Sequence, residues 1–93
     1  MINKIKVSRE FIRDLEKLSP QVRRKVRQRL KLLLQDFGYP SLHTEKLQGA
    51  VFAGEDVWSI RVDRNHRILF VIRKEENAYF LIAVGKHDIY RRF

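Results

Sequence analysis

The sequence predicts an α+β domain in which an N-terminal strand and a helical hairpin pack on one face of an antiparallel β-sheet. Before Pro40, apolar residues recur with the spacing of amphipathic helices. After Pro40 they alternate with polar residues or fill whole short segments, which is typical of strands. No linker, repeat or low-complexity segment interrupts the 93 residues, so we expect one domain over residues 1–93.

The chain begins with a predicted strand and a predicted helix. Residues 3–7 alternate apolar and polar side chains, which favours a short strand. Ser8 follows, and serine is a preferred N-cap because its hydroxyl oxygen accepts a hydrogen bond from a free backbone N–H. Apolar residues then recur on one side of a helix over residues 8–17.

A second helix is predicted directly after the first. Ser19-Pro20 marks its start, because proline lacks only an N–H that the first helical position leaves unused. Apolar residues form one stripe over residues 20–36, and Gly38 is the expected C-terminal stop. The two helices together form the predicted αα-hairpin.

Three strands make up the remainder of the prediction. Residues 56–62, 67–73 and 78–84 have the composition of strands, and the polar segments 63–66 and 74–77 are interpreted as turns. This pattern predicts an antiparallel meander. The second and third strands are apolar at nearly every position, so we expect them at the centre of the sheet with both faces covered.

The charge balance favours a polyanionic partner. Lys and Arg number 20 against 11 Asp and Glu, which leaves a formal charge of +9. Such an excess attracts polyanions and raises the rate of encounter with them. Nucleic acid is therefore the first candidate partner and an acidic protein is the second.

Several classes of protein lack support in the sequence. The chain has no cysteine, which excludes disulfides and Cys-based zinc sites and favours a reducing compartment. No spacing of His, Asp or Glu fits a metal site, and there is no P-loop, dinucleotide fingerprint or nucleophile elbow. Residues 1–6 lack the apolar run of a signal peptide, and no apolar stretch has transmembrane length. We expect a cytoplasmic protein with no metal, cofactor or membrane contact.

Six basic residues lie on the polar side of the second predicted helix. No acidic residue accompanies them, although a solvated helix usually carries acidic partners one turn away. They can form a face that holds nucleic-acid phosphates without reading sequence, and the alternative is an ordinary solvated face. Arg24 and Arg27 are our candidate RNA contacts in this run, which consists of Arg23, Arg24, Lys25, Arg27, Arg29 and Lys31.

The last third of the chain carries residues suited to acid–base chemistry on a phosphodiester. Arg61 and Arg67 flank the turn at 63–66, and arginine neutralises phosphate with a charge that it does not lose. Whether the two arginines share a face depends on the hairpin register, which the sequence leaves open. His87, close to Tyr90 after the last strand, titrates near neutrality and can move a proton.

Other side chains near these strands are candidates for RNA contact. Trp58 can stack on an unpaired base or pack in the core, and both interpretations are open. Lys46 and Lys86 place positive charge beside the strands and can contact phosphates. His66 lies at a strand end with no comparable set of neighbours, so we interpret it as an ordinary surface or core histidine.

Three blocks in this region resemble, in order, the RelE/ParE toxin superfamily of type II toxin–antitoxin systems. They are Glu45-Lys46-Leu47-Gln48-Gly49, Trp58-Ser59-Ile60-Arg61-Val62 and His66-Arg67-Ile68-Leu69-Phe70. The YoeB-like ribosome-dependent mRNA endonucleases are most similar in these blocks. The resemblance covers essentially the whole chain, because that family also runs from a strand through two helices into an antiparallel meander.

The resemblance implies roles for five residues. Glu45 is similar to the family's general base, Arg67 to the arginine that stabilises the phosphate, and His87 to the catalytic residue after the last strand. Tyr90 is similar to the nearby C-terminal aromatic residue, and Arg61 to a basic position that contacts RNA. Two features depart from the family pattern: the segment between the first and second blocks is longer, and two residues separate the histidine from the tyrosine.

The implied function is that of a toxin that cleaves mRNA on the ribosome. A base removes the proton of an RNA 2′-hydroxyl, which attacks the adjacent phosphorus, while arginine stabilises the charge and an acid protonates the 5′-oxygen. Glu45 is the expected base and His87 the expected acid, although the two can exchange roles. The expected partners are mRNA on the ribosome and an acidic antitoxin. Two alternatives stay open, a ParE-like DNA gyrase poison and a non-catalytic module that binds nucleic acid or antitoxin.

Overall fold

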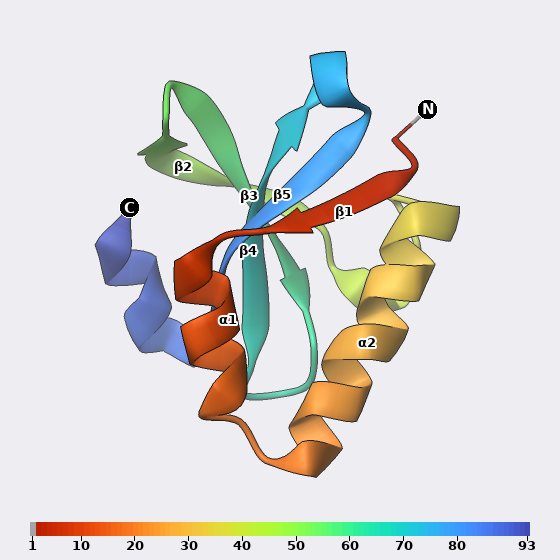
Figure 1. Ribbon diagram of the computed structural model, residues 1–93, viewed down its shortest axis with the longest axis vertical. Helices are drawn as coiled ribbons and strands as arrows, with labels where there is room; N and C mark the ends of the chain where they lie inside the picture. The colour runs from red at the N-terminus through yellow and green to blue at the C-terminus, as the bar shows by residue number, and fades with distance from the viewer. Residues whose placement is uncertain (1) are drawn as a thin grey trace.

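A five-stranded sheet with two α-helices on one face forms the body of the protein (Figure 1). The computed structural model describes residues 2–93. In chain order the elements are β1 (Lys4–Val7), α1 (Arg9–Glu16), α2 (Pro20–Gln35), the 3-10 helix η1 (Pro40–Leu42), β2 (Glu45–Phe52), β3 (Glu55–Arg61), β4 (Arg67–Arg73), η2 (Lys74–Glu76), β5 (Ala78–Gly85) and η3 (His87–Arg92). Within the described residues, no helix combines the length and apolar composition needed to cross a membrane.

The predicted helix starts are confirmed. The Ser8 hydroxyl accepts a hydrogen bond from the Phe11 N–H at 3.0 Å, and the Ser19 hydroxyl accepts one from the Val22 N–H at 3.2 Å. Each serine therefore satisfies one of the backbone donors that a helix leaves free at its first turn. In Figure 1 the two helices meet at their connecting turn and diverge along the sheet.

The predicted end of α2 at Asp36 is correct to within one residue, but the predicted stop at Gly38 is wrong. The helix ends at Gln35, three residues before Gly38, because Asp36 already has an extended backbone with φ at −158°. The Asp36 carboxylate then accepts a hydrogen bond from the Gly38 N–H at 2.9 Å. A short polar side chain that bonds to the backbone two residues later ends the helix here, in place of a left-handed glycine.

The predicted meander is confirmed and extended on both sides. β3, β4 and β5 pair antiparallel, with β4 and β5 at the centre of the order β1-β5-β4-β3-β2. β1 adds a parallel strand beside β5. β2, which the sequence interpretation did not assign as a strand, pairs antiparallel with β3 through the turn at Ala53 and Gly54, both of which have positive φ.

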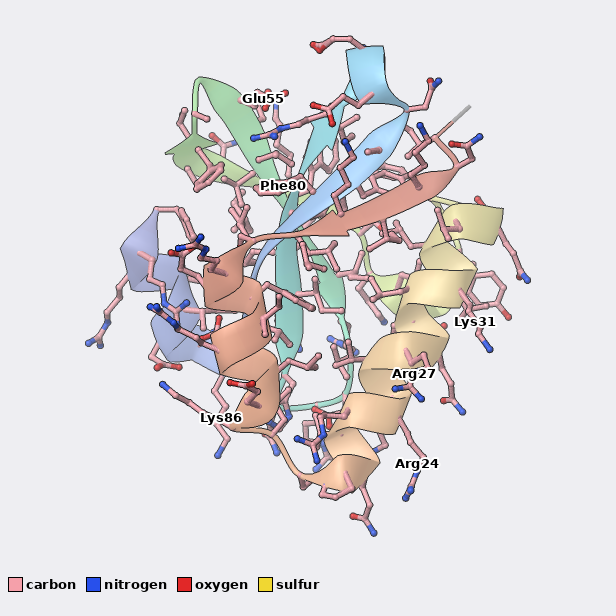
Figure 2. The ribbon with its side chains drawn as sticks, viewed as in Figure 1. Arg24, Arg27, Lys31, Glu55, Phe80 and Lys86 are labelled. Atoms are coloured by element: carbon pink, nitrogen blue, oxygen red, sulfur yellow. The ribbon has the colours of Figure 1, made fainter. Side chains whose placement is uncertain are left out.

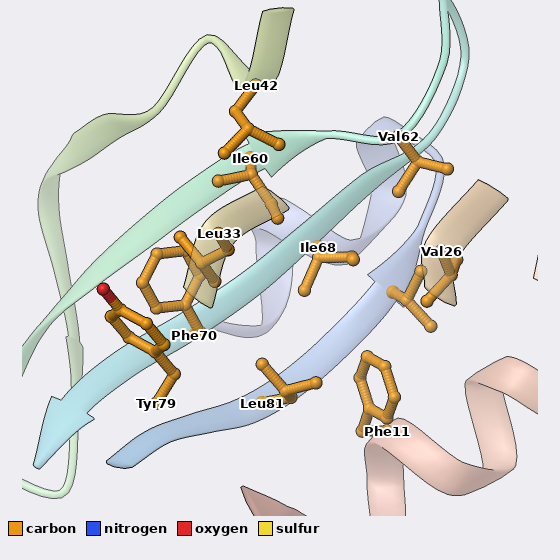
Figure 3. Packing of buried hydrophobic residues seen from close by; sticks show 11 residues of the cluster. Phe11, Val26, Leu33, Leu42, Ile60, Val62, Ile68, Phe70, Tyr79 and Leu81 are labelled. Carbon is orange, nitrogen blue, oxygen red and sulfur yellow. The ribbon is translucent and has the colours of Figure 1, made fainter. Parts of the chain in front are cut away.

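The helices bury one apolar cluster against the side of the sheet that we call the helix face. Figure 3 shows Phe11 of α1 and Val26 and Leu33 of α2 packed against side chains of β3, β4 and β5. Because side chains alternate along a strand, each of these strands sends every second residue into this cluster. The cluster consists of Phe11, Val26, Leu33, Leu42, Ile60, Val62, Ile68, Phe70, Tyr79, Leu81 and Val84.

A second cluster lies on the other side of the sheet, which we call the second face. A β-bulge shapes it, since Leu69 pairs with Ala83 and Phe70 pairs with Leu81. Ile82 is therefore an extra residue, and both it and Ala83 contribute to the second face. The cluster consists of Ala50, Val57, Leu69, Val71, Ile82, Ala83 and Ile89.

The C-terminal segment covers part of the second face. Ile89 of η3 is buried in the second cluster, and the Phe93 ring lies 5.9 Å from the Phe52 ring. Gly85 permits this packing, because a Cβ at that position would come within 2.9 Å of the Ile89 side chain. The expectation that β4 and β5 are covered on both faces is thus confirmed, with helices on one side and η3 on the other.

A buried carboxylate joins α1 to the end of β5 and to η3. Asp14 is 7% exposed and is the only buried charged residue within residues 2–93. It accepts a hydrogen bond from the Val84 N–H at 3.1 Å and two from the Arg92 guanidinium at 2.8 and 2.9 Å. β1 pairs with β5 only as far as Leu81. Beyond Leu81, the Asp14 carboxylate replaces the missing strand as the acceptor for the Val84 N–H.

Replacing Asp14 is expected to destabilise the protein. In Asp14→Ala the Val84 N–H loses its acceptor, and an unpaired buried donor costs about 1–3 kcal/mol. Asp14→Asn keeps an oxygen for Val84 but loses the charged pair with Arg92, so its loss should be smaller. The unfolding free energies of the two variants and of the wild type can be measured by urea denaturation.

Arg91→Ala is the matched control for this measurement. Arg91 is exposed on the same 3-10 helix as Arg92. Surface substitutions of this kind change stability by less than about 0.5 kcal/mol. Equal effects of Asp14→Ala and Arg91→Ala would contradict a structural role for the buried carboxylate.

Candidate nucleic-acid interface

The structure resolves the hairpin register that the sequence left open. Arg61, at the end of β3, pairs directly with Arg67, at the start of β4, and Arg67 pairs with Gly85 at the end of β5. Directly paired residues project to the same side, and this side is the second face, because Leu69 lies two residues after Arg67. The two guanidiniums therefore belong to one surface at one end of the sheet.

Arg61 has unused hydrogen-bonding capacity. Its Nη1 lies 3.2 Å from the Nε2 of His43. Because arginine only donates, the His43 nitrogen is the acceptor in this contact. The Nε of Arg61 is buried and has no hydrogen-bond partner within residues 2–93.

Arg67 is held by the turn that precedes it. Its Nη1 donates to the carbonyl oxygens of Asp63 at 3.0 Å and His66 at 3.1 Å. These bonds fix one edge of the guanidinium, and its other nitrogens make no hydrogen bond within the described chain. The side chain is thus held in one orientation, and part of its hydrogen-bonding capacity is still free for a ligand.

Glu45 lies on the same face as the arginines. It pairs with Ser59, which is two residues before Arg61 on β3, so Glu45 is a diagonal neighbour of Arg61. Its side chain is exposed. Lys46 alternates to the helix face, and its ammonium lies 3.9 Å from the Asp56 carboxylate.

His87 and Tyr90 form an aromatic pair on η3. Their ring centroids are 5.4 Å apart and the planes are nearly perpendicular, at 82°. Tyr90 is partly buried against the second cluster, whereas His87 is exposed. The tyrosine thus provides a fixed surface for the imidazole, and the pair begins two residues after Gly85, the partner of Arg67.

Five of the predicted RNA contacts lie elsewhere, and Lys46 on the helix face is one of them. Trp58 packs edge-on against Phe37 on the helix face, with 5.2 Å between ring centroids. In Figure 2, Arg24 and Arg27 project from α2 into solvent beside Lys31, and Lys86 extends below the C-terminal end of α1. The structure therefore groups Glu45, Arg61, Arg67, His87 and Tyr90 near one end of the second face. It separates them from the other predicted contacts, which are Arg24, Arg27, Lys46, Trp58 and Lys86. Within residues 2–93 there is no group of three His, Asp or Glu side chains arranged to hold a metal ion.

His66 has a partner that the sequence interpretation missed. The Oδ1 of Asp63 accepts hydrogen bonds from the His66 Nδ1 at 2.9 Å, the His66 N–H at 2.8 Å and the Asn65 N–H at 2.9 Å. Burial raises the pKa of Asp63, but the hydrogen bonds from His66 and Asn65 outweigh this effect and lower it overall. The spacing Asp-x-x-His within a turn was the available signal, since an aspartate commonly accepts from the backbone just after it.

The fold is that of the RelE-like toxins, as the sequence resemblance predicted. A YoeB/ParE toxin from Agrobacterium tumefaciens matches with a TM-score of 0.74 at 16% identity, over 90% of this chain and 98% of that one. RelE in the archaeal RelE–RelB complex from Pyrococcus horikoshii matches with a TM-score of 0.72 at 14% identity, over 92% and 96%. The intact E. coli RelBE toxin–antitoxin complex gives a TM-score of 0.70 at 21% identity, over 90% and 95%.

The sequence also identifies a family. A family model of phage-derived Gp49-like proteins (DUF891) matches residues 13–90, and the chain belongs to this family. No curated protein matches the chain significantly.

The lowered pKa of Asp63 predicts an acid-dependent stability. A carboxyl whose pKa is lower in the folded protein than its ordinary value of 3.8 stabilises the fold above that value. This contribution is lost as the pH falls through the folded pKa. Between about pH 5 and about pH 2, the unfolding free energy of the wild type should therefore fall more steeply than that of Asp63→Asn.

Lys25→Gln is the control for Asp63→Asn. It removes only the distant ammonium, 3.9 Å from the other Asp63 oxygen, and leaves the three hydrogen bonds. Its pH dependence should stay close to that of the wild type, as measured by urea unfolding at each pH. Parallel curves for the wild type and Asp63→Asn would refute the role of Asp63.

Proposed function

We propose that this protein is the toxin of a type II toxin–antitoxin pair and that it cleaves mRNA on the ribosome. The observation that carries the proposal is the direct pairing of Arg61 with Arg67 at one end of the sheet, where Arg67 uses only one of its guanidinium nitrogens in hydrogen bonds within the described residues. Two adjacent guanidiniums are suited to a phosphodiester and to the extra negative charge of its pentacoordinate transition state. The RelE-like fold and the Glu45, His87 and Tyr90 side chains on the same end support it.

The reaction needs two proton transfers around the phosphorus. Glu45 takes the proton of the RNA 2′-hydroxyl, and the resulting oxygen attacks the adjacent phosphorus to form a 2′,3′-cyclic phosphate. The bond to the 5′-oxygen breaks, and that oxygen receives a proton from His87. Arg61 and Arg67 hold the nonbridging oxygens throughout. Exchange of the Glu45 and His87 roles gives the same products.

The surroundings of each group fit these roles. The Glu45 carboxylate is exposed, so RNA can approach it without rearrangement of the sheet. The Tyr90 ring limits the positions open to His87 by edge-on contact at 5.4 Å. Arg67 is anchored through two backbone carbonyls, which keeps its free edge in place as charge develops.

The ribosome is proposed as co-substrate because the paired arginines occupy a small surface. Arg24, Arg27 and Lys31 lie one turn apart on α2, where they project into solvent away from that surface (Figure 2). Within the described residues none of these three makes an ion pair. Such a stripe is suited to the backbone of a second, structured RNA while the sheet end holds the cleaved strand.

Arg67→Ala is expected to lower cleavage of ribosome-bound mRNA by ~10²–10³-fold, the usual loss when one donor to a developing oxyanion is removed. Single-turnover cleavage on programmed ribosomes measures the rate. The fold should persist, because the carbonyls that Arg67 bonds lie in a surface turn where water can replace it. Circular dichroism and the thermal midpoint check this.

Arg64→Ala controls for the loss of one positive charge from the same turn. Arg64 is exposed and makes no hydrogen bond in residues 2–93, so its removal should change the cleavage rate by less than about threefold. If Arg67→Ala and Arg64→Ala cleave alike, Arg67 has no part in the chemistry.

One alternative is supported by the similarity to the Agrobacterium protein, whose name includes ParE. A ParE-like protein would act on DNA gyrase without cutting RNA. In parallel reactions, cleavage of mRNA with normal gyrase supercoiling supports the proposed nuclease. If the mRNA stays intact and supercoiling by gyrase stops, the protein is a gyrase poison and the proposed nuclease is wrong.

An acidic antitoxin is the proposed protein partner, since the charge of +9 favours association with a protein of opposite sign. Two of the similar structures are complexes of RelE with RelB. The product of the adjacent reading frame should be acidic, and its association rate with this protein should fall steeply as salt rises, as stopped-flow fluorescence can measure. A neighbouring product that does not bind would argue against the toxin–antitoxin assignment.

A further inference from the structure

A polar cavity of about 430 Å³ opens at the same end of the sheet as the arginine pair. It lies between the end of α1, the start of α2, the end of β5 and η3, and its lining includes Val84 of the helix-face cluster and Ile89 of the second cluster. The reaction described above uses none of its acid–base groups. His66 and Lys86 line it, together with Lys17, Asp88 and the Asp14–Arg92 pair.

The His66 ring is fixed with one nitrogen available. A carboxylate can only accept, so the contact at 2.9 Å from Asp63 Oδ1 requires the proton on His66 Nδ1. The Nε2 is then directed away from the turn, and it makes no hydrogen bond within residues 2–93. The His66 side chain is 13% exposed, and His66 is one of the residues that line the cavity.

The charges around the cavity favour an anion. Asp14 and Arg92 neutralise each other through two hydrogen bonds. Lys17 and Lys86 supply two ammonium groups, and Asp88 supplies one carboxylate. The lining therefore carries a net charge of +1 (two lysines less one aspartate), which rises to +2 when the His66 ring is protonated.

The cavity and the arginine pair are neighbours through the backbone. His66 and Arg67 are consecutive, and their side chains project to opposite faces at the start of β4. Gly85 pairs with Arg67, and the next residue, Lys86, lines the cavity. An RNA strand that is bound at the arginine pair and continues across the ends of β4 and β5 would therefore reach His66, Lys17 and Lys86.

We infer that this cavity binds a phosphate of the RNA strand next to the one held by Arg61 and Arg67. His66 Nε2, in its protonated form, and the ammonium groups of Lys17 and Lys86 are the ligands, and Asp63 acts as the positioning residue for the imidazole. This subsite rests on the proposed function, because that function supplies the strand. It gives the protein a hold on RNA beyond the scissile phosphate, from the opposite face of the same sheet end.

The test uses a DNA trinucleotide, which has phosphodiesters but no 2′-hydroxyl to attack and is therefore not cleaved. Nuclear magnetic resonance follows the His66 ring signal, the Gly85 amide and the Arg67 side-chain signal during titration. The inferred subsite predicts that all three signals shift with a common dissociation constant. His66→Ala and Lys17→Gln should each weaken binding about tenfold, the factor for one hydrogen bond to a charged group.

Matched variants separate specific contact from general charge. Lys4→Gln removes the same charge from exposed β1 and should leave binding unchanged. Lys17→Gln should also reduce the slope of log affinity against log salt by about 0.7, the value for one phosphate contact on a single strand. His66→Gln keeps an N–H donor, so it should bind more tightly than His66→Ala if His66 acts as a phosphate ligand.

Each outcome is decisive for one of the two proposals. If Arg67 shifts while His66 and Gly85 do not, the subsite is wrong and the proposed nuclease is untouched. If all three shift but ribosome-bound mRNA stays intact, the nuclease is wrong and the subsite persists. If inorganic phosphate or a mononucleotide shifts His66 with the affinity of the trinucleotide, the cavity binds free phosphate compounds and the strand-phosphate assignment is overturned.

Discussion

The Asp14 carboxylate is the interaction on which the arrangement of both sheet faces depends. Helix α1 covers the helix face, whereas η3 covers the second face, and Asp14 bonds to β5 and η3 at once. Removal of η3 would expose the Ile82 side of the central strands, which Ile89 now buries. It would also release His87 and Tyr90. A buried charge is costly to desolvate, and three hydrogen bonds are what make this one tolerable. The position of His87 and Tyr90 therefore depends on a carboxylate of α1 that is 70 residues before Val84 in sequence.

Alternation along β4 divides the chemistry of the sheet end between two faces. Consecutive side chains on a strand project in opposite directions, so His66 and Arg67 cannot act on the same phosphorus while the pairing of Arg67 with Arg61 holds. The turn at residues 63–66 positions both side chains. Its carbonyls hold Arg67, and the Asp63 carboxylate holds His66. One short turn thereby orients Arg67 on one side of the sheet and His66 on the other, which is the arrangement that the proposed contacts to two neighbouring phosphates require.

The sequence was sufficient for the parts of the fold that local rules specify. Ser8 and Ser19 were predicted as caps because capping depends on residues within one helical turn. β2 was missed because its strand is partly exposed and Gly49, with φ at 74°, interrupts the alternation that identifies strands. The pairing of Arg61 with Arg67 and the contact of Asp14 with Arg92 depend on register and on distant segments, which no local pattern contains. Glu45, Arg67 and His87 came from a family resemblance, and only the fold shows which of the predicted site residues share a face.

The arginine pair also carries an energetic signature of function. Two like charges directly opposite on neighbouring strands destabilise a sheet, and the buried Nε of Arg61 adds the cost of an unmade hydrogen bond. Either defect would be easily removed by a polar neutral residue at position 61. An anion bound by the two guanidiniums would offset the repulsion between them, since its negative charge is attracted to both. An anion that binds there should therefore stabilise the folded protein by mass action. Like charges in direct pairing and an unmade buried hydrogen bond both break the rules of stable folding. Where no other part of the chain compensates for such defects, they indicate a surface at which a partner can do so.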